Sequence, residues 1–304
     1  MPGETAIKRR TRTATAREWH FARQASTGPL PCGRGYDSTI MIDLRRIKMP
    51  DALVFLYRSN GLIAVDKPPG LAVHAAPGPG GSVLKELAAQ TGLAGLTPVH
   101  RLDRDASGVL LFAETTALAA AVQRTWEQSE KTYLALCDGV PSAAARTIDA
   151  PILEHQTGKP ERMRNALRYY TAQNPGVEIA ALPAPKTSGV HAAGRPSRTA
   201  YRVVEALGSF SLLEVQPAQG RMHQIRVHLA HVGHALAVDS LYGKRTVLRE
   251  SDAGGSADTV LLTRMPLHAA RLTFTFNGER ITVESALPRD MTDAMAFLRT
   301  QRNP

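Results

Sequence analysis

The stretch HRLDRDASGVLLFA (100–113) contains the densest polar cluster of the chain, directly followed by an apolar run. The run 109–113 predicts a buried strand, and loops at strand ends are where rigid scaffolds present catalytic groups. Asp103 and Asp105 stand among two arginines, whose positive charge favours an ionised carboxylate. Such a carboxylate suits a nucleophile or a base. The same residues would also fit a salt-bridged turn before a strand.

Outward from this cluster, hydrophobic patterning and turn residues predict further strands and helices. The expected strands are 54–57, 62–66, 131–139, 199–207, 211–216, 272–276 and 281–285. Four helices are expected. The first begins at Ser82, and the second begins at Thr115 or Thr116 with Leu118, Val122 and Trp126 on one face. The third spans 222–232 and ends before Gly233, and the last lies near the end of the chain around Phe297 and Leu298. Strands outnumber helices and do not alternate with them. We therefore expect an α+β fold with a mainly antiparallel mixed sheet and flanking helices.

Two other segments lack periodicity. Residues 1–50 hold ten Lys and Arg against four Asp and Glu, and we expect a basic tail without regular structure there. A reading frame that starts at Met41 or Met49 is the alternative. Residues 154–198 are the least regular part of the rest, and 182–196 is expected to be a surface loop. Residues 51–304 are expected to form one catalytic domain.

A second polar cluster, GRMHQIRVH (220–228), falls at the start of the expected helix 222–232. An arginine that points inward beside a sheet needs a carboxylate partner, and Asp103 or Asp105 could supply it. A capped amphipathic helix with basic residues on its surface is the alternative. Tyr133 lies in an expected strand, where it could face a cleft and stack on a base, or belong to the core.

Other classes of site find little support. The sequence has no G-x-S-x-G elbow for a hydrolase, no G-x-G-x-x-G and no P-loop. His223, His228, His231 and His234 follow one another without an H-E-x-x-H motif, so we expect no metal site. The two cysteines, Cys32 and Cys137, have no metal-type spacing, and we expect them to be reduced thiols.

The formal net charge is +10, which favours a polyanionic partner and leaves the fold open. No apolar stretch is long enough to span a membrane, and no apolar region follows the basic N-terminus as in a secretory signal. We therefore expect a cytoplasmic protein, with a monomer as the default state.

Taken together, these segments resemble the RluA-type family of pseudouridine synthases over about residues 53–288. The resemblance rests on ordered motifs: GLIAVDKPPGLAVH (61–74), VHRLDRDASGVLLFA (99–113), KTYLAL (131–136), SLLEVQPAQGRMHQIRVHLAHVGHALAVDSLYG (211–243) and PLHAARLTFTF (266–276). It implies an isomerase that converts specific uridines of structured RNA to pseudouridine, with base flipping and without metal or organic cofactor.

The resemblance also implies roles for individual residues. Asp103 would be the catalytic aspartate, Tyr133 would stack on the target base and take part in proton removal, and Arg226, or else Arg221, would pair with Asp103. Arg101 would hold the flipped nucleotide or fill the space it leaves. The implied substrate-binding residues are Arg101, His100, Arg221, His223 and Gln224.

Several positions depart from the family pattern: Ala106 stands where threonine is usual, Met222 where threonine or serine is usual, and Val238 where glycine is usual, while Asp66 stands where asparagine is also frequent. We expect them to alter loop geometry or substrate fit. Ribosomal RNA is favoured over transfer RNA, because a modest charge outside residues 1–50 suggests recognition of local RNA shape. A noncatalytic RNA-binding or chaperone protein on the same fold is the alternative, but it would have no chemical need to keep Asp103, Tyr133 and Arg226 together.

Overall fold

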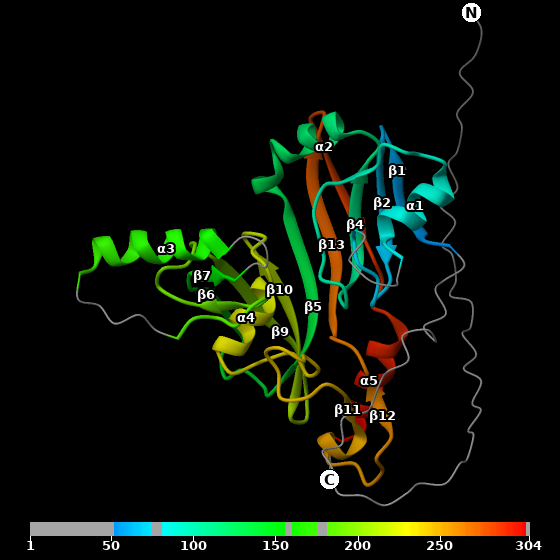
Figure 1. The fold of residues 1–304 in the computed structure, drawn as a ribbon. Helices are drawn as coiled ribbons and strands as arrows, with labels where there is room; N and C mark the ends of the chain where they lie inside the picture. Colours follow the sequence, from blue (N-terminus) through cyan, green and yellow to red (C-terminus); the bar gives the residue numbers. More distant parts are fainter. Residues whose placement is uncertain (1–51, 75–80, 156–159, 176–180, 302–304) are drawn as a thin grey trace, which may run out of the picture. The chain divides into compact units, whose positions relative to one another are not determined.

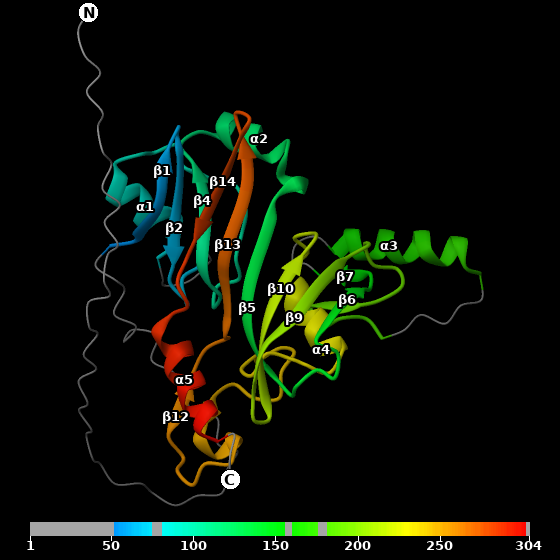
Figure 2. The ribbon, with the colours of Figure 1, turned by 180° about the vertical axis from the view of Figure 1, so that it is seen from behind.

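The computed structural model describes residues 52–74, 81–155, 160–175 and 181–301. The prediction of a basic tail over residues 1–50 lies outside these ranges. Figure 1 shows the order of the elements along the chain, and Figure 2 shows them from behind.

The elements are as follows. The strands are β1 Val54–Ser59, β2 Leu62–Lys67, β3 Thr97–Pro98, β4 Ser107–Ala113, β5 Glu130–Asp138, β6 Ala145–Asp149, β7 Ile152–Glu154, β8 Ser188–Val190, β9 Arg198–Leu207, β10 Phe210–Pro217, β11 Leu248–Arg249, β12 Val260–Leu262, β13 Leu267–Phe276 and β14 Glu279–Glu284. The helices are α1 Val83–Thr91, α2 Thr116–Gln123, α3 Pro160–Gln173, α4 Gln224–His231 and α5 Arg289–Thr300, with 3-10 turns η2 Trp126–Gln128 and η3 Glu250–Ala253.

A mixed sheet of ten strands forms the centre of the described residues. Its main path is β1-β2-β4-β13-β5-β10-β9-β6, with β14 beside β13 and β3 beside β4. Every pairing is antiparallel except that of β13 with β4. The α+β architecture with a mainly antiparallel mixed sheet is therefore confirmed. The long strand β5 runs between the two halves of this sheet (Figures 1 and 2).

Both faces of the sheet are covered, because alternate residues of each strand point to opposite sides. Ile63, Leu110 and Ala135 pack in one cluster with residues of α1 and α4. Their strand neighbours belong to two other clusters, one that includes α2 and one that includes α5. The near-continuous apolar runs of β2 and β4 follow from this two-sided burial.

Two predicted hairpin turns are present. Asn60 and Gly61 have φ of 53° and 71°, and Asn277 and Gly278 have φ of 51° and 80°. Positive φ at both central residues is the type I′ pattern that suits the twist of paired strands. Helix α1 has Ser82 as its N-cap, as predicted, and Thr115 rather than Thr116 caps α2.

The helix expected to carry Trp126 ends earlier than predicted. Helix α2 stops at Gln123, and Trp126 begins the separate 3-10 turn η2. The Thr125 hydroxyl donates to the main-chain oxygens of Val122 and Thr275, at 3.3 and 3.0 Å. These contacts tie the chain to β13 and turn it out of the helical path.

The region 154–198 is more ordered than predicted. Helix α3 was not expected, because it buries no residue and few residues of PERMRNALRYYTAQ are aliphatic. The expected surface loop 182–196 is wrong in part: it contains strand β8, and Ser188 and His191 are buried. Helix α4 is shorter than the predicted 222–232, since His223 has a φ of 57° and sits before its first turn.

Candidate active site

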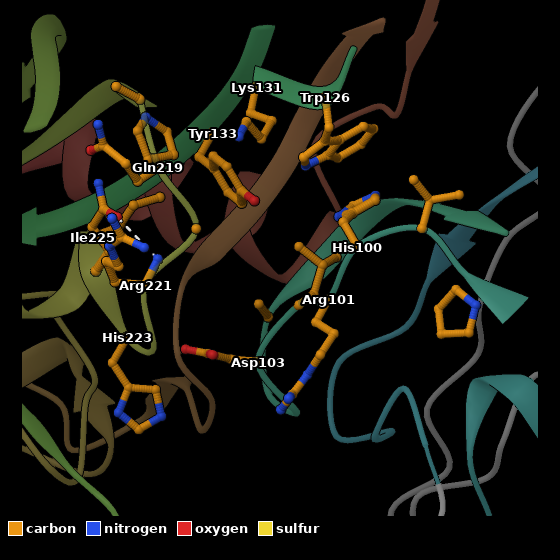
Figure 3. Close-up of a pocket in the computed structure, with 18 of the residues that line it drawn as sticks. His100, Arg101, Asp103, Trp126, Lys131, Tyr133, Gln219, Arg221, His223 and Ile225 are labelled. Carbon is orange, nitrogen blue, oxygen red and sulfur yellow. Dashed lines mark hydrogen bonds between the residues drawn. The ribbon is translucent and has the colours of Figure 1, made fainter. Parts of the chain in front are cut away.

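A cleft of about 1010 Å³ opens beside β5, and it collects residues from both polar clusters (Figure 3). The residues that line it include His100, Arg101, Asp103, Trp126, Lys131, Tyr133, Arg221, His223, Gln224 and Arg226. All eight residues predicted to act in catalysis or substrate binding are among them. The fold thus brings together segments that are more than 100 residues apart in sequence.

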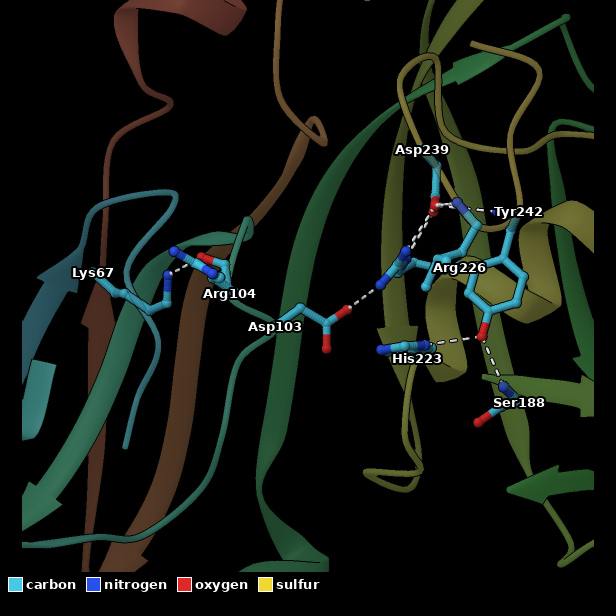
Figure 4. A network of polar contacts seen from close by, with 9 residues as sticks. Lys67, Asp103, Arg104, Ser188, His223, Arg226, Asp239 and Tyr242 are labelled. Atoms are coloured by element: carbon cyan, nitrogen blue, oxygen red, sulfur yellow. Dashed lines mark hydrogen bonds and ion pairs between the residues drawn. The ribbon is translucent and has the colours of Figure 1, made fainter. Parts of the chain in front are cut away.

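Asp103 lies in the loop between β3 and β4, and Arg226 lies in the first turn of α4. Nη1 of Arg226 donates to Oδ2 of Asp103 at 3.2 Å (Figure 4). The Arg226 side chain is 9% exposed and that of Asp103 is 27% exposed, so the carboxylate keeps access to the cleft. Of the open alternatives, the structure selects Asp103 over Asp105 as the partner, and Arg226 over Arg221 as the pairing arginine.

Arg226 is itself held by Asp239, which was not singled out in the sequence. Nε and Nη2 of Arg226 donate to the two carboxylate oxygens of Asp239, both at 2.7 Å. Burial lowers the pKa of the Arg226 guanidinium, but the hydrogen bonds and charge of Asp239 and the charge of Asp103 outweigh it, so the pKa is raised. A fork of this kind fixes the guanidinium plane and leaves Nη1 directed at Asp103.

A second layer surrounds Arg226. Its guanidinium lies over the ring of Tyr242, 5.0 Å from the ring centre. The Tyr242 oxygen accepts from the main-chain N–H of Ser188 at 2.8 Å and lies 2.8 Å from Nδ1 of His223 (Figure 4). Burial lowers the pKa of His223, despite the nearby charge of Asp103. His223 is therefore a neutral ring at neutral pH, anchored at one nitrogen beside Asp103.

Tyr133 faces the same cleft from strand β5, with its hydroxyl directed into the open space (Figure 3). Burial raises the pKa of its phenol, and the negative charge of Asp103 adds to the effect. The hydroxyl therefore stays protonated at neutral pH. Such a side chain offers an aromatic face for stacking and an O–H group for hydrogen bonding.

The other predicted substrate-binding residues differ in how many hydrogen bonds their side chains already make within the protein. Arg101 is exposed and makes no ion pair or hydrogen bond within the described part of the chain. Arg221 donates to the main-chain oxygen of Pro196 at 3.3 Å, and its buried Nε has no partner there. Gln224 donates to Arg198 O and Thr199 Oγ1 and accepts from Arg221 N, so its amide braces the loop.

Lys67 is a further residue that the sequence analysis did not single out. It is fully buried, and its ammonium donates to the main-chain oxygens of Pro68, Arg104 and Ala106 at 2.7–2.8 Å. Burial lowers its pKa to about 7, although the charge of Asp105 opposes this. Lys67 thereby fixes the loop that carries Asp103. Its position at the end of an apolar strand, next to Pro68, is the signal that could have indicated it.

Gly108 follows the same loop at the start of β4, where the backbone lies very close to that of β13. Its φ is 106°, and an added Cβ would lie 2.3 Å from the main-chain oxygen of Ala269. Only glycine fits this close approach of two backbones. The loop of Asp103 is thus fixed by Lys67 on one side and by Gly108 on the other.

A serine and a histidine also meet, at Ser107 and His268, whose Oγ and Nδ1 are 3.0 Å apart. Both are buried and neither lines the cleft. Nε2 of His268 faces the main-chain oxygen of Ser285 at 3.1 Å, so the pair serves packing rather than hydrolysis. Within the described ranges, no cluster of His, Cys, Asp and Glu could hold a metal ion, and no helix is long and apolar enough to cross a membrane.

Comparison with known proteins places the sequence in one family. The family model described as RNA pseudouridylate synthase matches residues 61–231. Ribosomal large subunit pseudouridine synthase C of Escherichia coli (strain K12) is 33% identical over 254 residues, covering 82% of this chain and 71% of that protein. Ribosomal large subunit pseudouridine synthase D of Nitrosomonas europaea is 36% identical over 261 residues, covering 81% of this chain and 65% of that protein.

The fold has solved counterparts. The structure of human RNA pseudouridylate synthase domain containing 4 matches with a TM-score of 0.61 at 23% identity, covering 81% of this chain and 93% of that one. That of human RNA pseudouridylate synthase domain containing 1 matches with a TM-score of 0.55 at 24% identity, covering 77% and 83%. The chain therefore belongs to the RluA-type family of RNA pseudouridine synthases, which are isomerases.

Proposed function

We propose that this protein converts uridine to pseudouridine in a large-subunit ribosomal RNA, with Asp103 as the catalytic residue. The observation that carries the proposal is the Asp103 carboxylate, which is open to the cleft and bonded to Arg226 at 3.2 Å, with the ring of Tyr133 in the same cleft. The names of the relatives, which refer to the ribosomal large subunit, support the choice of RNA.

The reaction makes specific demands on these residues. The bond between N1 of uracil and C1′ of ribose breaks, the base rotates, and a bond from C5 to C1′ forms. C5 then loses its proton and N1 gains one, so atoms and electrons balance without a redox partner or group donor. We infer that Asp103 acts on the nucleoside as the charged group, held in position by Arg226.

Tyr133 would contact the base while it is free of its sugar. Its ring would stack on the uracil, and its protonated hydroxyl would take part in the proton transfer near C5. Since the target base must leave its helical stack to reach Asp103, the proposal includes base flipping, which costs a few kcal/mol. Arg101, exposed at the rim of the cleft, would hold the flipped nucleotide or fill its place.

Several cations in the cleft favour RNA as the substrate. Arg101 and Arg221 line it, and the Arg101 side chain forms no ion pair within the described residues, while Arg221 lies near the charge of Glu154. Phosphate contacts from such side chains position RNA and make its affinity depend on salt. Because the fold supplies these contacts within one chain, we propose that the protein acts as a monomer in the cytoplasm.

A map of pseudouridines in all cellular RNAs, with and without this gene, tests the proposal. We expect one or a few ribosomal sites to disappear and to return with the wild-type gene but not with Asp103→Asn. Loss of transfer RNA sites instead would correct the substrate. If no site disappears, and the purified protein binds ribosomal RNA without modifying it, the noncatalytic RNA-binding function replaces this proposal.

A further inference from the structure

The cleft extends beyond the residues that act on the target uridine. In Figure 3, Tyr133 lies between two groups of side chains, with Arg221 and His223 on one side and Trp126 on the other. The volume of the cleft, about 1010 Å³, is at the upper end of the range of roughly 300–1,000 Å³ that is typical of sites for small ligands. One flipped uridine occupies only part of such a space.

Trp126 is held in a fixed position in the part of the cleft away from Arg221 and His223 (Figure 3). Its ring stacks on His100, with ring centres 5.2 Å apart and 26° between the planes. Nε2 of His100 accepts from the main-chain N–H of Leu111 at 3.1 Å, which fixes the imidazole. Burial and the charge of Lys131 lower the pKa of His100 to about 3, so this ring is neutral. Trp126 is therefore a preorganised, partly exposed aromatic surface.

Lys131 supplies a positive charge next to that surface. It lies two residues before Tyr133 on β5, and strand alternation places both side chains on the same face. Its Nζ is 5.7 Å from the ring centre of Trp126. Among the described residues it makes no hydrogen bond or ion pair, and Glu127, the nearby acidic residue of the cleft, lies outside ion-pair distance.

An ammonium group that is half-buried and without a carboxylate partner is costly unless a ligand supplies the negative charge. The Trp126 ring beside it stacks on His100 and remains partly exposed to the cleft. Such a ring fits a nucleobase, since stacking on aromatic side chains is how proteins hold single-stranded RNA. The ammonium of Lys131 and the ring of Trp126 lie next to each other, so that a phosphate and a base of the same RNA strand could contact both.

We propose that Trp126 and Lys131 form a second nucleotide subsite, which binds a nucleotide adjacent to the target uridine. The indole stacks on the base of that nucleotide, and the ammonium binds its phosphate. The inference rests on the proposed function, because it takes the Asp103 side of the cleft as the site of the target.

Tryptophan fluorescence tests the subsite directly. The chain has two tryptophans, Trp19 and Trp126, so that the full-length Trp19→Phe protein reports on Trp126 alone. A short fluorescein-labelled oligouridylate is the probe for anisotropy, and the same unlabelled oligomer is the probe for emission. We expect emission to be quenched by stacking, with the same Kd as the anisotropy change.

Substitutions separate the two contacts. Trp126→Ala should weaken oligouridylate binding by about fivefold or more, and Trp126→Phe should restore much of it. Lys131→Gln should reduce the slope of log Kd against log salt by about 0.7, the value for one phosphate on a single strand. Lys131→Arg should keep the slope. Lys85→Gln, which removes an exposed lysine of α1, is the matched control and should leave binding unchanged.

Two results would overturn the proposed subsite. One is oligouridylate binding without any change in Trp126 emission, and the other is the absence of binding at the highest oligouridylate concentration tested. Failure of the proposed function has a different signature. In that case the wild-type protein forms no pseudouridine in transcribed ribosomal or transfer RNA, whatever the fluorescence shows. Quenching together with absent modification would retain the subsite as a single-stranded RNA site and reject the enzymatic proposal.

Discussion

Arg226 and Asp239 form a buried ion pair through two parallel hydrogen bonds, both 2.7 Å long. Asp239 also accepts from the main-chain N–H groups of Leu241 and Tyr242, so the carboxylate is tied to the turn that follows it. The contact from Arg226 to Asp103 is longer, at 3.2 Å. Asp239 does not line the cleft, and it fixes the arginine so that Nη1 is directed at Asp103, the proposed catalytic residue.

Asp239→Asn should therefore impair positioning. We expect a stability loss of about 3–5 kcal/mol, since one partner of a buried pair is left uncompensated. We also expect a larger fall in kcat than change in KM. Urea unfolding and single-turnover pseudouridylation measure the two effects. Arg280→Gln, which breaks an exposed ion pair with Glu130, is the control and should change neither much. A KM effect with unchanged kcat would contradict the positioning role.

Asp103→Asn should abolish isomerisation and keep RNA affinity within a few fold. The amide preserves the shape of the carboxylate but lacks its charge, and the phosphate contacts of the cleft remain. Single-turnover assays on ribosomal RNA, with filter binding in parallel, provide the measurement. Asp105→Asn is the matched control, because Asp105 is exposed and does not line the cleft. Comparable turnover by Asp103→Asn would refute the catalytic assignment.

Tyr133→Phe keeps the ring and removes the hydroxyl. We expect RNA binding to be retained and the rate to fall by about 10²–10⁴, the usual range for a lost acid–base group. Since the pKa of Tyr133 is raised, the wild-type rate should show no alkaline loss from this group up to pH 10. A Phe variant with the wild-type rate would restrict Tyr133 to stacking.

Lys67 gives a pH signature in stability. Its folded pKa of about 7 lies below the unfolded value of 10.5, so between these values the unfolded chain binds the additional proton. The free energy of unfolding should then rise with pH from 7 to 10, by up to about 1.4 kcal/mol per pH unit from this group. Lys67→Met should lack that slope. Parallel urea titrations compare the two proteins, and equal slopes would show that the three carbonyl acceptors keep the pKa of Lys67 near its ordinary value.

Gly108→Ala should disrupt the loop of Asp103, because the methyl group meets the backbone of Ala269 at 2.3 Å and φ is positive. We expect a loss of several kcal/mol in stability, roughly the sum of a strained backbone and an overpacked contact. Gly220→Ala is the matched control, since no atom lies within 4 Å of its added Cβ. Thermal unfolding distinguishes them, and equal melting temperatures would contradict the close approach.

The sequence predicted the sheet and the cleft residues well, and the reasons are local. Alternating apolar strands, Asn-Gly turns and capping residues act within a few positions, and the resemblance of the ordered motifs to the RluA-type family indicated Asp103, Tyr133 and Arg226. Helix α3 escaped prediction because it buries no residue and few of its residues are aliphatic. Lys67 and Asp239 escaped because their importance depends on partners elsewhere in the chain. Lys67 contacts Arg104, 37 residues away, and Asp239 contacts Arg226, 13 residues away.

Lys67 contacts the loop of Asp103 through main-chain oxygens alone. Every amino acid offers that oxygen, so the anchor does not depend on which side chains occupy positions 104 and 106. A substitution at position 104 or 106 would leave both contacts of Lys67 in place, although replacing Arg104 would remove its own bond to the main-chain oxygen of Gly70. The path of the chain beneath Asp103 is thereby separated from the identity of the side chains at the surface of the loop.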